Sequence, residues 1–309
     1  MSTKQVAIST KGKIAYTSDT NNKKEYIHYK HFSGKSPGII FLSGYMSDME
    51  GNKALALENL CKELGHSYIR FDYRGHGISD GTLVDGSISN WTKDALIILD
   101  NIAKGQQILV GSSMGGWIMM LVSLKRKERI SGLIGIASAP DFTEDLLPLQ
   151  LGKDKIEEIY SQGECKIARD DGSENIITKM LLEDGKTNLV LRDKITIDCP
   201  VELLHGINDE IVPWETSLGI LDKISSKNEL IKLRNGEEYL YKDLSIKSMK
   251  CTNSEFDDNP EITAYIQVKD LTNKNKDDVF VFNGWMFSSS PSIAPFDHPV
   301  YDIWLVSCY

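Results

Sequence analysis

Short apolar runs alternate with longer amphipathic stretches from the start of the chain to about residue 225. The apolar runs are bounded by Gly, Pro or Asp, which is typical of strands in a mostly parallel sheet covered by helices. The clearest strands are expected at 38–42, 68–71, 107–110, 130–137 and 201–204. The clearest helices are expected at 52–64, 91–102, 114–124 and 213–224. Residues 5–17 and 24–31 are expected to form an antiparallel hairpin that turns at Asp19. The pattern predicts an α/β fold with a doubly wound, mostly parallel sheet.

Two segments depart from this rhythm. Residues of about 141–198 are charged and partly helical, which indicates a lid inserted between two sheet strands. Its apolar positions are Leu146, Leu147, Leu149, Leu151, Met180, Leu181 and Leu182. From residue 228 to 309, short β-branched and aromatic runs alternate with polar turns, which predicts a small all-β domain after the α/β domain of residues 1–227.

Composition narrows the classes of function. The 309 residues carry 44 acidic and 35 basic side chains, a net charge of −9, so the chain lacks the basic surface that nucleic acids and anionic membranes bind. The N-terminus has no apolar segment that would direct export, and the longest apolar runs are too short to span a bilayer. The five cysteines show no metal-ligand spacing, which fits a reducing compartment. We therefore expect a cytoplasmic protein without a metal.

A nucleophile elbow is the strongest chemical signal in the sequence. The run Gly111-Ser-Ser113-Met-Gly115 matches the pattern G-x-S-x-G and lies between the expected strand 107–110 and the expected helix 114–124. Its glycines allow two backbones to approach closely, and the helix N-terminus favours a developing negative charge. Alone, the motif would more often be an ordinary glycine-rich turn. The flanking strand and helix favour Ser113 as a nucleophile.

Candidates for the other parts of such a site follow other strands. The backbone N–H groups of Met114 and Tyr45 are the expected oxyanion donors, because they follow the nucleophile and an earlier strand. The loop before Tyr45 contains Gly44, and the alternative is that this glycine only forms a turn that ends the strand. Asp209 follows the strand 201–204 and precedes a helix, which is the position of the acid in the chain order Ser, Asp, His. Taken alone, Asp209 would more often be a helix-capping carboxylate.

At these motifs the chain resembles the α/β-hydrolase superfamily, in the branch that contains mitochondrial palmitoyl-protein thioesterase-type hydrolases and their bacterial relatives. The resemblance covers residues of about 5 to 225. It is carried by Phe41-Leu-Ser-Gly-Tyr, Gly51-Asn-Lys-Ala-Leu-Ala, Arg70-Phe-Asp-Tyr-Arg-Gly-His-Gly, Leu109-Val-Gly-Ser-Ser-Met-Gly-Gly-Trp, and Leu203-Leu-His-Gly with Asp209. It implies serine-dependent hydrolysis of esters or thioesters without metal or organic cofactor, with Ser113 matching the nucleophile and Asp209 the acid.

The chain departs from the family at the triad histidine. That residue lies about thirty positions beyond the acid in the family, where this chain has Glu238 or Tyr239, and no histidine occurs between residues 206 and 297. His298 is the first candidate for a substitute base and His76 a weaker one, whereas His205, His28 and His31 are expected to be structural or exposed. Loss of one triad member typically costs several orders of magnitude in rate.

The tail beyond about residue 228 resembles a different family, a small bacterial domain of unknown function usually found in exported proteins. The resemblance is carried by Cys251, Phe282-Asn-Gly-Trp-Met-Phe-Ser-Ser-Ser-Pro, His298-Pro-Val-Tyr-Asp-Ile-Trp and Cys308. It accounts for His298 without a catalytic role. Cys251 and Cys308 could be paired in the exported relatives, but here we expect them to be reduced. We hypothesise a fusion near 226–238 in which the hydrolase lost its last strand, histidine and helix.

The sequence thus predicts a serine hydrolase of carboxylic esters or thioesters, with a small-molecule or lipid-acyl substrate and no cofactor. The alternative is a catalytically impaired hydrolase fold that acts as a binding protein or not at all. A third interpretation makes the C-terminal domain the working part, with Trp285, Tyr301 and Trp304 binding a partner, although aromatic residues in so small a domain are more often core. The sequence carries no signal for the oligomeric state or the acyl chain length.

Overall fold

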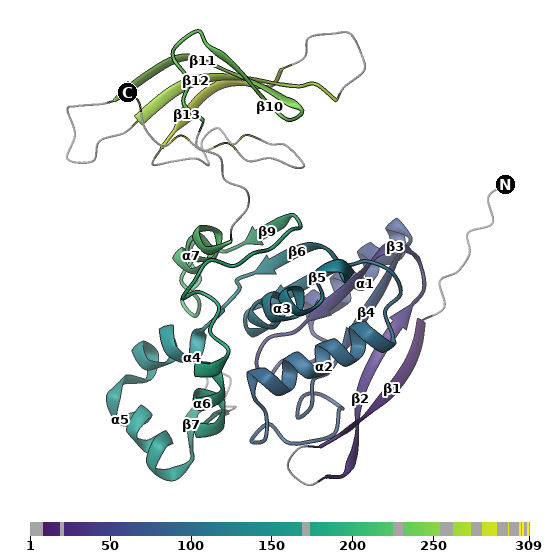
Figure 1. The fold of residues 1–309 in the computed structure, drawn as a ribbon. Coiled ribbons are helices and arrows are strands. Elements are labelled where there is room, and N and C mark those ends of the chain that lie inside the picture. The colour runs from purple at the N-terminus through teal and green to yellow at the C-terminus, as the bar shows by residue number, and fades with distance from the viewer. Residues whose placement is uncertain are drawn as a thin grey trace, which may run out of the picture. The chain divides into compact units, whose positions relative to one another are not determined.

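The computed structural model divides the chain into two compact units, Met1–Lys227 and Asn228–Tyr309 (Figure 1). It describes residues 9–18, 22–168, 174–224, 231–253, 262–272 and 280–288, and positions 296, 303, 305 and 308. The expected turn at Asp19 and the start of the hypothesised fusion point, 226–230, lie outside the described residues.

The N-terminal unit contains a seven-stranded, mostly parallel sheet with strand order β1-β2-β4-β3-β5-β6-β9. Its strands are β1 (Ser9–Thr17), β2 (Lys24–Phe32), β3 (Lys35–Leu42), β4 (His66–Phe71), β5 (Gln107–Ser112), β6 (Ile130–Ile136) and β9 (Val201–Leu204). β1 and β2 form an antiparallel hairpin, and β2 is antiparallel to β4. The pairs β3–β4, β3–β5, β5–β6 and β6–β9 are parallel. The predicted α/β class and the N-terminal hairpin are confirmed.

Helices pack on both faces of this sheet (Figure 1). They are α1 (Asn52–Leu64), α2 (Ile88–Asn101), α3 (Met114–Lys125) and α7 (Glu215–Lys223), with a short 3-10 turn at Lys127–Arg129. Successive strand residues point to opposite faces. Accordingly Ile40 and Leu109 belong to the core cluster that contains α2 and α3, whereas Phe41 and Val110 pack with Ala54 of α1. Burial on both faces explains why these strands are continuous apolar runs in the sequence.

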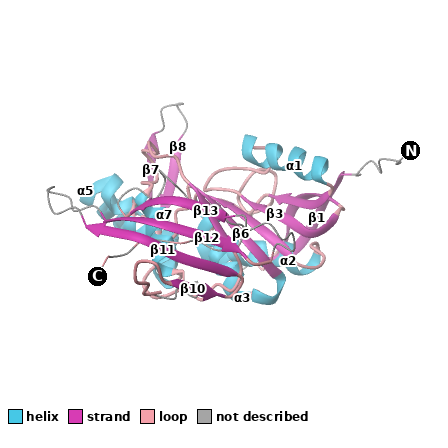
Figure 2. Ribbon diagram, turned by 90° about the horizontal axis from the view of Figure 1, so that it is seen from above, coloured by secondary structure: helices cyan, strands magenta, loops and turns pink. Residues whose placement is uncertain are grey.

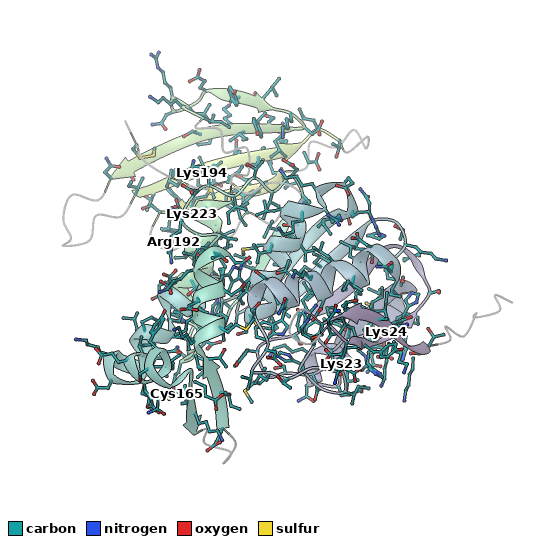
Figure 3. The ribbon with its side chains drawn as sticks, turned by 60° about the horizontal axis from the view of Figure 1, so that its bottom comes forward. Lys23, Lys24, Cys165, Arg192, Lys194 and Lys223 are labelled. Carbon is teal, nitrogen blue, oxygen red and sulfur yellow. A yellow bond between two sulfur atoms is a disulfide. The ribbon has the colours of Figure 1, made fainter. Side chains whose placement is uncertain are left out.

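An insertion separates β6 from β9 in the chain, although the two strands are neighbours in the sheet. It contains α4 (Phe142–Asp145), α5 (Leu147–Gln162), β7 (Glu164–Ala168), β8 (Glu174–Thr178) and α6 (Lys179–Thr187). β7 and β8 form a two-stranded antiparallel sheet, which Cys165 marks in Figure 3. Leu181 and Leu182 of α6 are buried in the main core cluster, whereas Leu149 of α5 is 84% exposed. The insertion therefore shares part of the core of the N-terminal unit.

The two ends of the insertion are tied together at their base. The buried Asp141 carboxylate accepts hydrogen bonds from the N–H groups of Val190 and Leu191, at 2.8 and 2.9 Å. Arg192 then pairs with Asp145, with 2.6 Å between Nη2 and Oδ1. One carboxylate at the start of the insertion thus fixes the backbone at its end.

The C-terminal unit contains a four-stranded antiparallel sheet, drawn as magenta arrows in Figure 2. Its strands are β10 (Glu238–Tyr241), β11 (Leu244–Asn253), β12 (Ile262–Asp270) and β13 (Phe280–Phe287). Leu244, Ile266 and Val268 are buried in the core of this unit. Trp285 lies edge to face with Tyr265 at 5.4 Å and is 40% exposed. Of the other aromatic residues considered for partner binding, Tyr301 and Trp304 lie outside the described residues.

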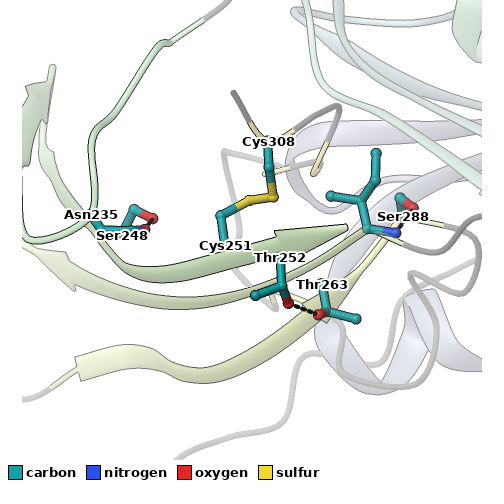
Figure 4. Close-up of a disulfide and its surroundings, with 8 residues drawn as sticks. Asn235, Ser248, Cys251, Thr252, Thr263, Ser288 and Cys308 are labelled. Atoms are coloured by element: carbon teal, nitrogen blue, oxygen red, sulfur yellow. Dashed lines mark hydrogen bonds between the residues drawn. A yellow bond between two sulfur atoms is a disulfide. The ribbon is translucent and has the colours of Figure 1, made fainter. Parts of the chain in front are cut away.

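Cys251 and Cys308 form a disulfide, with their Cα atoms 5.7 Å apart (Figure 4). The expectation that these two thiols are reduced is therefore wrong for this structure. Ile303 and Leu305 pack on the same apolar cluster as Cys251 of β11, which brings the end of the chain to this strand. Cysteine spacing could not reveal this pairing, because it depends on tertiary packing between positions 57 residues apart.

Candidate active site

Ser113 stands at the sharp turn between β5 and α3. Its backbone has φ 53° and ψ −120°, and a residue other than glycine at positive φ costs about 1–3 kcal/mol, so its surroundings must hold it there. Three hydrogen bonds do so: Ser113 N–H donates to Ile136 O at 3.0 Å, and Ser113 O accepts from Gly116 N–H at 2.9 Å and from Ala139 N–H at 3.0 Å. The residue is half-buried rather than packed in the interior. The local geometry is thus that of the predicted elbow.

The glycines of the elbow allow β5, α3 and the end of β3 to touch. A Cβ atom on Gly115 would lie 2.0 Å from Leu42 O, and one on Gly111 would lie 2.5 Å from Gly115 O. Both distances are too short for any side chain. The first turn of α3 therefore rests directly on the last residue of β3, which continues into the loop of the second expected oxyanion donor.

That loop, residues 43–49, lies beside the nucleophile. A Cβ atom on Gly44 would be 3.3 Å from Ser113 Cβ. Tyr45 follows Gly44 and Met114 follows Ser113, so the two expected oxyanion donors lie on adjacent segments. Among the hydrogen bonds between described residues, neither the Tyr45 N–H nor the Met114 N–H has an acceptor. The structure brings these three residues together, and the oxyanion role of the two N–H groups stays a prediction.

Asp209 lies in the turn after β9. Because β5, β6 and β9 are parallel neighbours, their carboxyl ends meet at one edge of the sheet, and the loops of Ser113 and Asp209 leave from that edge. Asp209 Oδ1 accepts hydrogen bonds from the N–H groups of Ile211 at 3.0 Å and Val212 at 2.9 Å. This oxygen thus caps the turn before α7, whereas the N-cap position of the helix, which the alternative gave to Asp209, is held by Trp214. Oδ2 has no hydrogen bond among the described residues.

No histidine among the described residues is hydrogen-bonded to Ser113 or Asp209. His205 has partners at both ring nitrogens, with Nδ1 2.7 Å from Ser217 Oγ and Nε2 2.8 Å from Val212 O. His76 Nε2 accepts from Met46 N–H at 3.1 Å. His298 lies outside the described residues. The general base of the predicted mechanism is therefore not assigned.

The residues expected at the family position of the histidine belong to the C-terminal unit. Glu238 and Tyr239 lie in β10, paired with β11. Glu238 accepts a hydrogen bond from Ser245 Oγ. Their place in the small sheet agrees with a change of fold after α7.

The insertion touches the loop 43–49 through one aromatic side chain. The Tyr45 hydroxyl donates to Ile176 O of β8, and burial raises the pKa of this hydroxyl above its usual range. The Tyr45 ring lies 5.7 Å from that of Trp91 on α2 and 6.5 Å from that of Phe142 on α4. The residue whose N–H is the expected oxyanion donor thus anchors the insertion through its side chain.

Sequence reasoning missed a polar cluster behind this loop. Asp72, which follows β4, accepts from Met49 N–H at 2.7 Å and from Ile78 N–H at 3.0 Å. Burial raises the pKa of Asp72, and these two N–H groups oppose the rise. The run Arg70-Phe-Asp-Tyr-Arg-Gly-His-Gly carries part of the family resemblance, and its His76 is the weaker base candidate, but neither feature assigns a role to Asp72. Its polar residues between buried aromatic positions were the signal that could have indicated a structural role at the site.

The described residues contain neither a cluster of metal ligands nor a membrane-spanning helix. Among the described residues, no three His, Cys, Asp or Glu side chains gather closely enough to hold a metal ion. No helix in this part of the chain is both long and apolar enough to cross a membrane.

Comparisons with known proteins agree with this geometry. Residues 38–156 match the family described as "alpha/beta hydrolase fold", and residues 216–308 match "Uncharacterized protein conserved in bacteria (DUF2155)". The rat mitochondrial palmitoyl-protein thioesterase ABHD10 is 43% identical over 230 residues, which cover 72% of this chain and 76% of the rat protein. An uncharacterized protein of Rickettsia prowazekii is 33% identical over 89 residues, 29% of this chain and 57% of its own length.

Solved structures give the same result for the N-terminal unit. A putative hydrolase from Agrobacterium vitis S4 has a TM-score of 0.67 and 36% identity, covering 71% of this chain and 87% of its own. The mouse α/β hydrolase domain-containing protein 10 has a TM-score of 0.62 and 41% identity, covering 70% and 85%. The chain therefore belongs to the α/β-hydrolase family, as a homologue of the ABHD10 palmitoyl-protein thioesterases that carries a DUF2155 domain at its C-terminal end.

Proposed function

We propose that this protein is a serine hydrolase of acyl esters or thioesters, in which Ser113 is the nucleophile. The observation that carries the proposal is the strained Ser113 backbone, held between β5 and α3 beside Gly44 of the loop 43–49. Such strain persists where the surroundings over-determine it, and it is concentrated at functional sites. The hydrolase homology and the thioesterase relatives support an acyl substrate.

The proposed reaction uses these groups as follows. Ser113 Oγ forms a bond to the acyl carbonyl carbon as its proton passes to a base, and the N–H groups of Tyr45 and Met114 stabilise the negative charge on the carbonyl oxygen. The C–S or C–O bond then breaks, and the thiol or alcohol leaves with that proton. Water hydrolyses the acyl-enzyme to release a carboxylic acid and restore Ser113. Asp209 orients the base, for which no described side chain is in place.

Labelling of the full chain with a fluorophosphonate probe tests the nucleophile. We expect the wild type to be labelled and Ser113→Ala not to be labelled. Ser112→Ala is the matched control, because it removes the hydroxyl of the preceding residue, the last of β5, and leaves Ser113 intact. Asp209→Asn should slow labelling. An unlabelled wild type, or equal labelling of Ser113→Ala, would contradict the proposal.

A second candidate function is that of a binding protein with the hydrolase fold but no turnover. It is favoured by the histidine contacts, because each described ring near the site has another partner. Free imidazole separates the two functions through the hydrolysis of a p-nitrophenyl ester. A Ser113-dependent rate that imidazole leaves unchanged indicates that the chain supplies its own base. A rate that is measurable only with imidazole indicates a nucleophile that lacks its base.

A further inference from the structure

We propose that His76 is a positioning residue that holds the loop 43–49 in the conformation in which Tyr45 presents its N–H to the substrate oxygen. The proposal rests on the proposed function, because it assigns a role within that reaction. It is carried by the contact of His76 with Met46, the residue directly after the expected oxyanion donor.

The Met46 backbone needs an external constraint. Met46 has φ 56°, the left-handed conformation that favours glycine, so the loop stores strain directly after Tyr45. Its N–H donates to His76 Nε2 at 3.1 Å. The turn itself adds one bond, from Ser47 N–H to Gly44 O at 3.1 Å. His76 therefore supplies the side-chain acceptor that keeps this strained peptide oriented.

The partners of His76 fix its tautomer. A backbone N–H can only donate, so Nε2, which faces Met46, carries no hydrogen. A carbonyl can only accept, so Nδ1, which lies 3.2 Å from Arg74 O, carries the hydrogen. Protonating Nε2 would remove the acceptor for the Met46 N–H. The ring must be neutral and in one orientation to hold the loop.

The surroundings of the ring favour this neutral form. His76 is 3% exposed, and its ring meets those of Tyr45, Tyr73 and Trp91 at centroid distances of 6.2, 5.7 and 5.2 Å. Burial lowers the pKa of His76, which the contact with Arg74 O only partly opposes. Because the Nε2 lone pair is already engaged by Met46 N–H, His76 is not the substitute base considered from the sequence.

The carbonyl that orients His76 is itself anchored in the core. Arg74 Nη2 pairs with Oδ1 of the buried Asp94 on α2 at 2.7 Å, and Arg74 N–H donates to Asp94 Oδ2 at 2.8 Å. Arg74 O also accepts from Trp91 Nε1 at 3.1 Å. A line of hydrogen bonds thus runs from α2 through Arg74 and His76 to Met46.

The same buried ring would also contribute to packing, and two variants separate packing from positioning. His76→Phe keeps an aromatic ring in the cluster but removes the acceptor. His76→Gln replaces the ring but can place Oε1 near Met46 N–H. Loss of one oxyanion donor costs about 10²–10³-fold in kcat, so a misoriented donor should cost about 10- to 100-fold. A group that acts on the transition state changes kcat more than KM.

The experiment measures Ser113-dependent hydrolysis of p-nitrophenyl butyrate by the full chain, with Ser113→Ala as the blank and His31→Phe on β2 as the matched control. We expect kcat to fall about 10- to 100-fold in His76→Phe with little change in KM, and to recover in His76→Gln. Amide exchange at Met46, read by NMR, should accelerate in His76→Phe but not in His31→Phe. If His76→Phe does not fold, His76→Asn, which is too short to reach Met46, takes its place.

Four results would overturn the proposal. Wild-type kcat in His76→Phe, or an unchanged exchange rate at Met46, would show that the contact does not position the loop. A kcat in His76→Gln as low as in His76→Phe would show that the ring, and not the acceptor, is what matters. Absence of Ser113-dependent turnover in the wild type would overturn this proposal together with the proposed function, whereas turnover with any of the first three outcomes overturns this proposal alone.

Discussion

Replacing Gly115 by alanine adds a single methyl group at the point where α3 rests on β3. The new Cβ would lie 2.0 Å from Leu42 O, whereas ordinary contact begins near 3.4 Å, so the two backbones must separate by about 1.4 Å. Neither side can yield locally, because the neighbouring atom is a backbone carbonyl in a paired strand. We expect overpacking to destabilise the protein by about 1–3 kcal/mol. A displacement of about 1 Å at a reacting group costs about 100-fold in rate.

Urea unfolding and the rate of fluorophosphonate labelling measure these two effects. Gly219→Ala on α7 is the matched control, because no atom lies within 4 Å of its added Cβ and helical Gly→Ala substitutions are favourable by about 0.5–1 kcal/mol. We expect the free energy of unfolding and the labelling rate to fall in Gly115→Ala alone. If Gly115→Ala labelled at the wild-type rate, the close approach of α3 to β3 would not be what places Ser113.

Three further changes test other parts of the structure. Tyr45→Phe removes the hydroxyl that bonds to β8 and should lower the free energy of unfolding by about 1 kcal/mol in urea; an unchanged midpoint would contradict that contact. Burial opposes ionisation of Glu58, but its basic partners Lys62 and Arg70 hold its pKa below the ordinary 4.5. The contribution of the ionised Glu58 to the free energy of unfolding should therefore be complete above pH 4.5 and lost as the pH falls below that value. Urea midpoints between pH 6 and 3 should therefore fall less steeply in Glu58→Gln, and parallel curves would refute the ion pairs as the cause. Cys308→Ser opens a loop closed across 57 residues and should destabilise the C-terminal unit by up to about 4 kcal/mol. For the wild type, we expect reductant to accelerate proteolysis of this unit, and an equal rate with and without reductant would contradict the effect.

The sheet could be predicted because its strands are buried on both faces and are therefore apolar runs. The strand Val201–Leu204 and the helix Asn52–Leu64 begin and end where the pattern puts them. The helix expected at 91–102 begins earlier, at Ile88, because the Ser87 hydroxyl accepts from Asn90 N–H and caps it. A serine before a helix is a recognisable N-cap signal, but a prediction made from the apolar positions alone does not use it.

The elbow could be predicted because its chemistry is local. A strand, two glycines and a helix within a few residues determine the turn at Ser113, and the structure places that serine at such a turn. Its catalytic role and that of Asp209 stay predictions. The bonds of His76 and Asp72 to the loop 43–49 join residues 30 and 23 positions apart, across two parallel strands. No sequence pattern specifies such contacts, because they depend on how the loops after β3 and β4 pack.

The carboxylate at the base of the insertion gives this fold a modular boundary. Asp141 joins the point where the chain leaves β6 to the stretch that leads back to β9, so the intervening residues begin and end at fixed positions. Because the two ends of the insertion are held together, lengthening the segment between them costs little additional conformational entropy. The entropic cost of closing a loop grows only with the logarithm of its length. Evolution can therefore exchange the segment between these two anchors while the hydrogen bonds of the sheet stay intact.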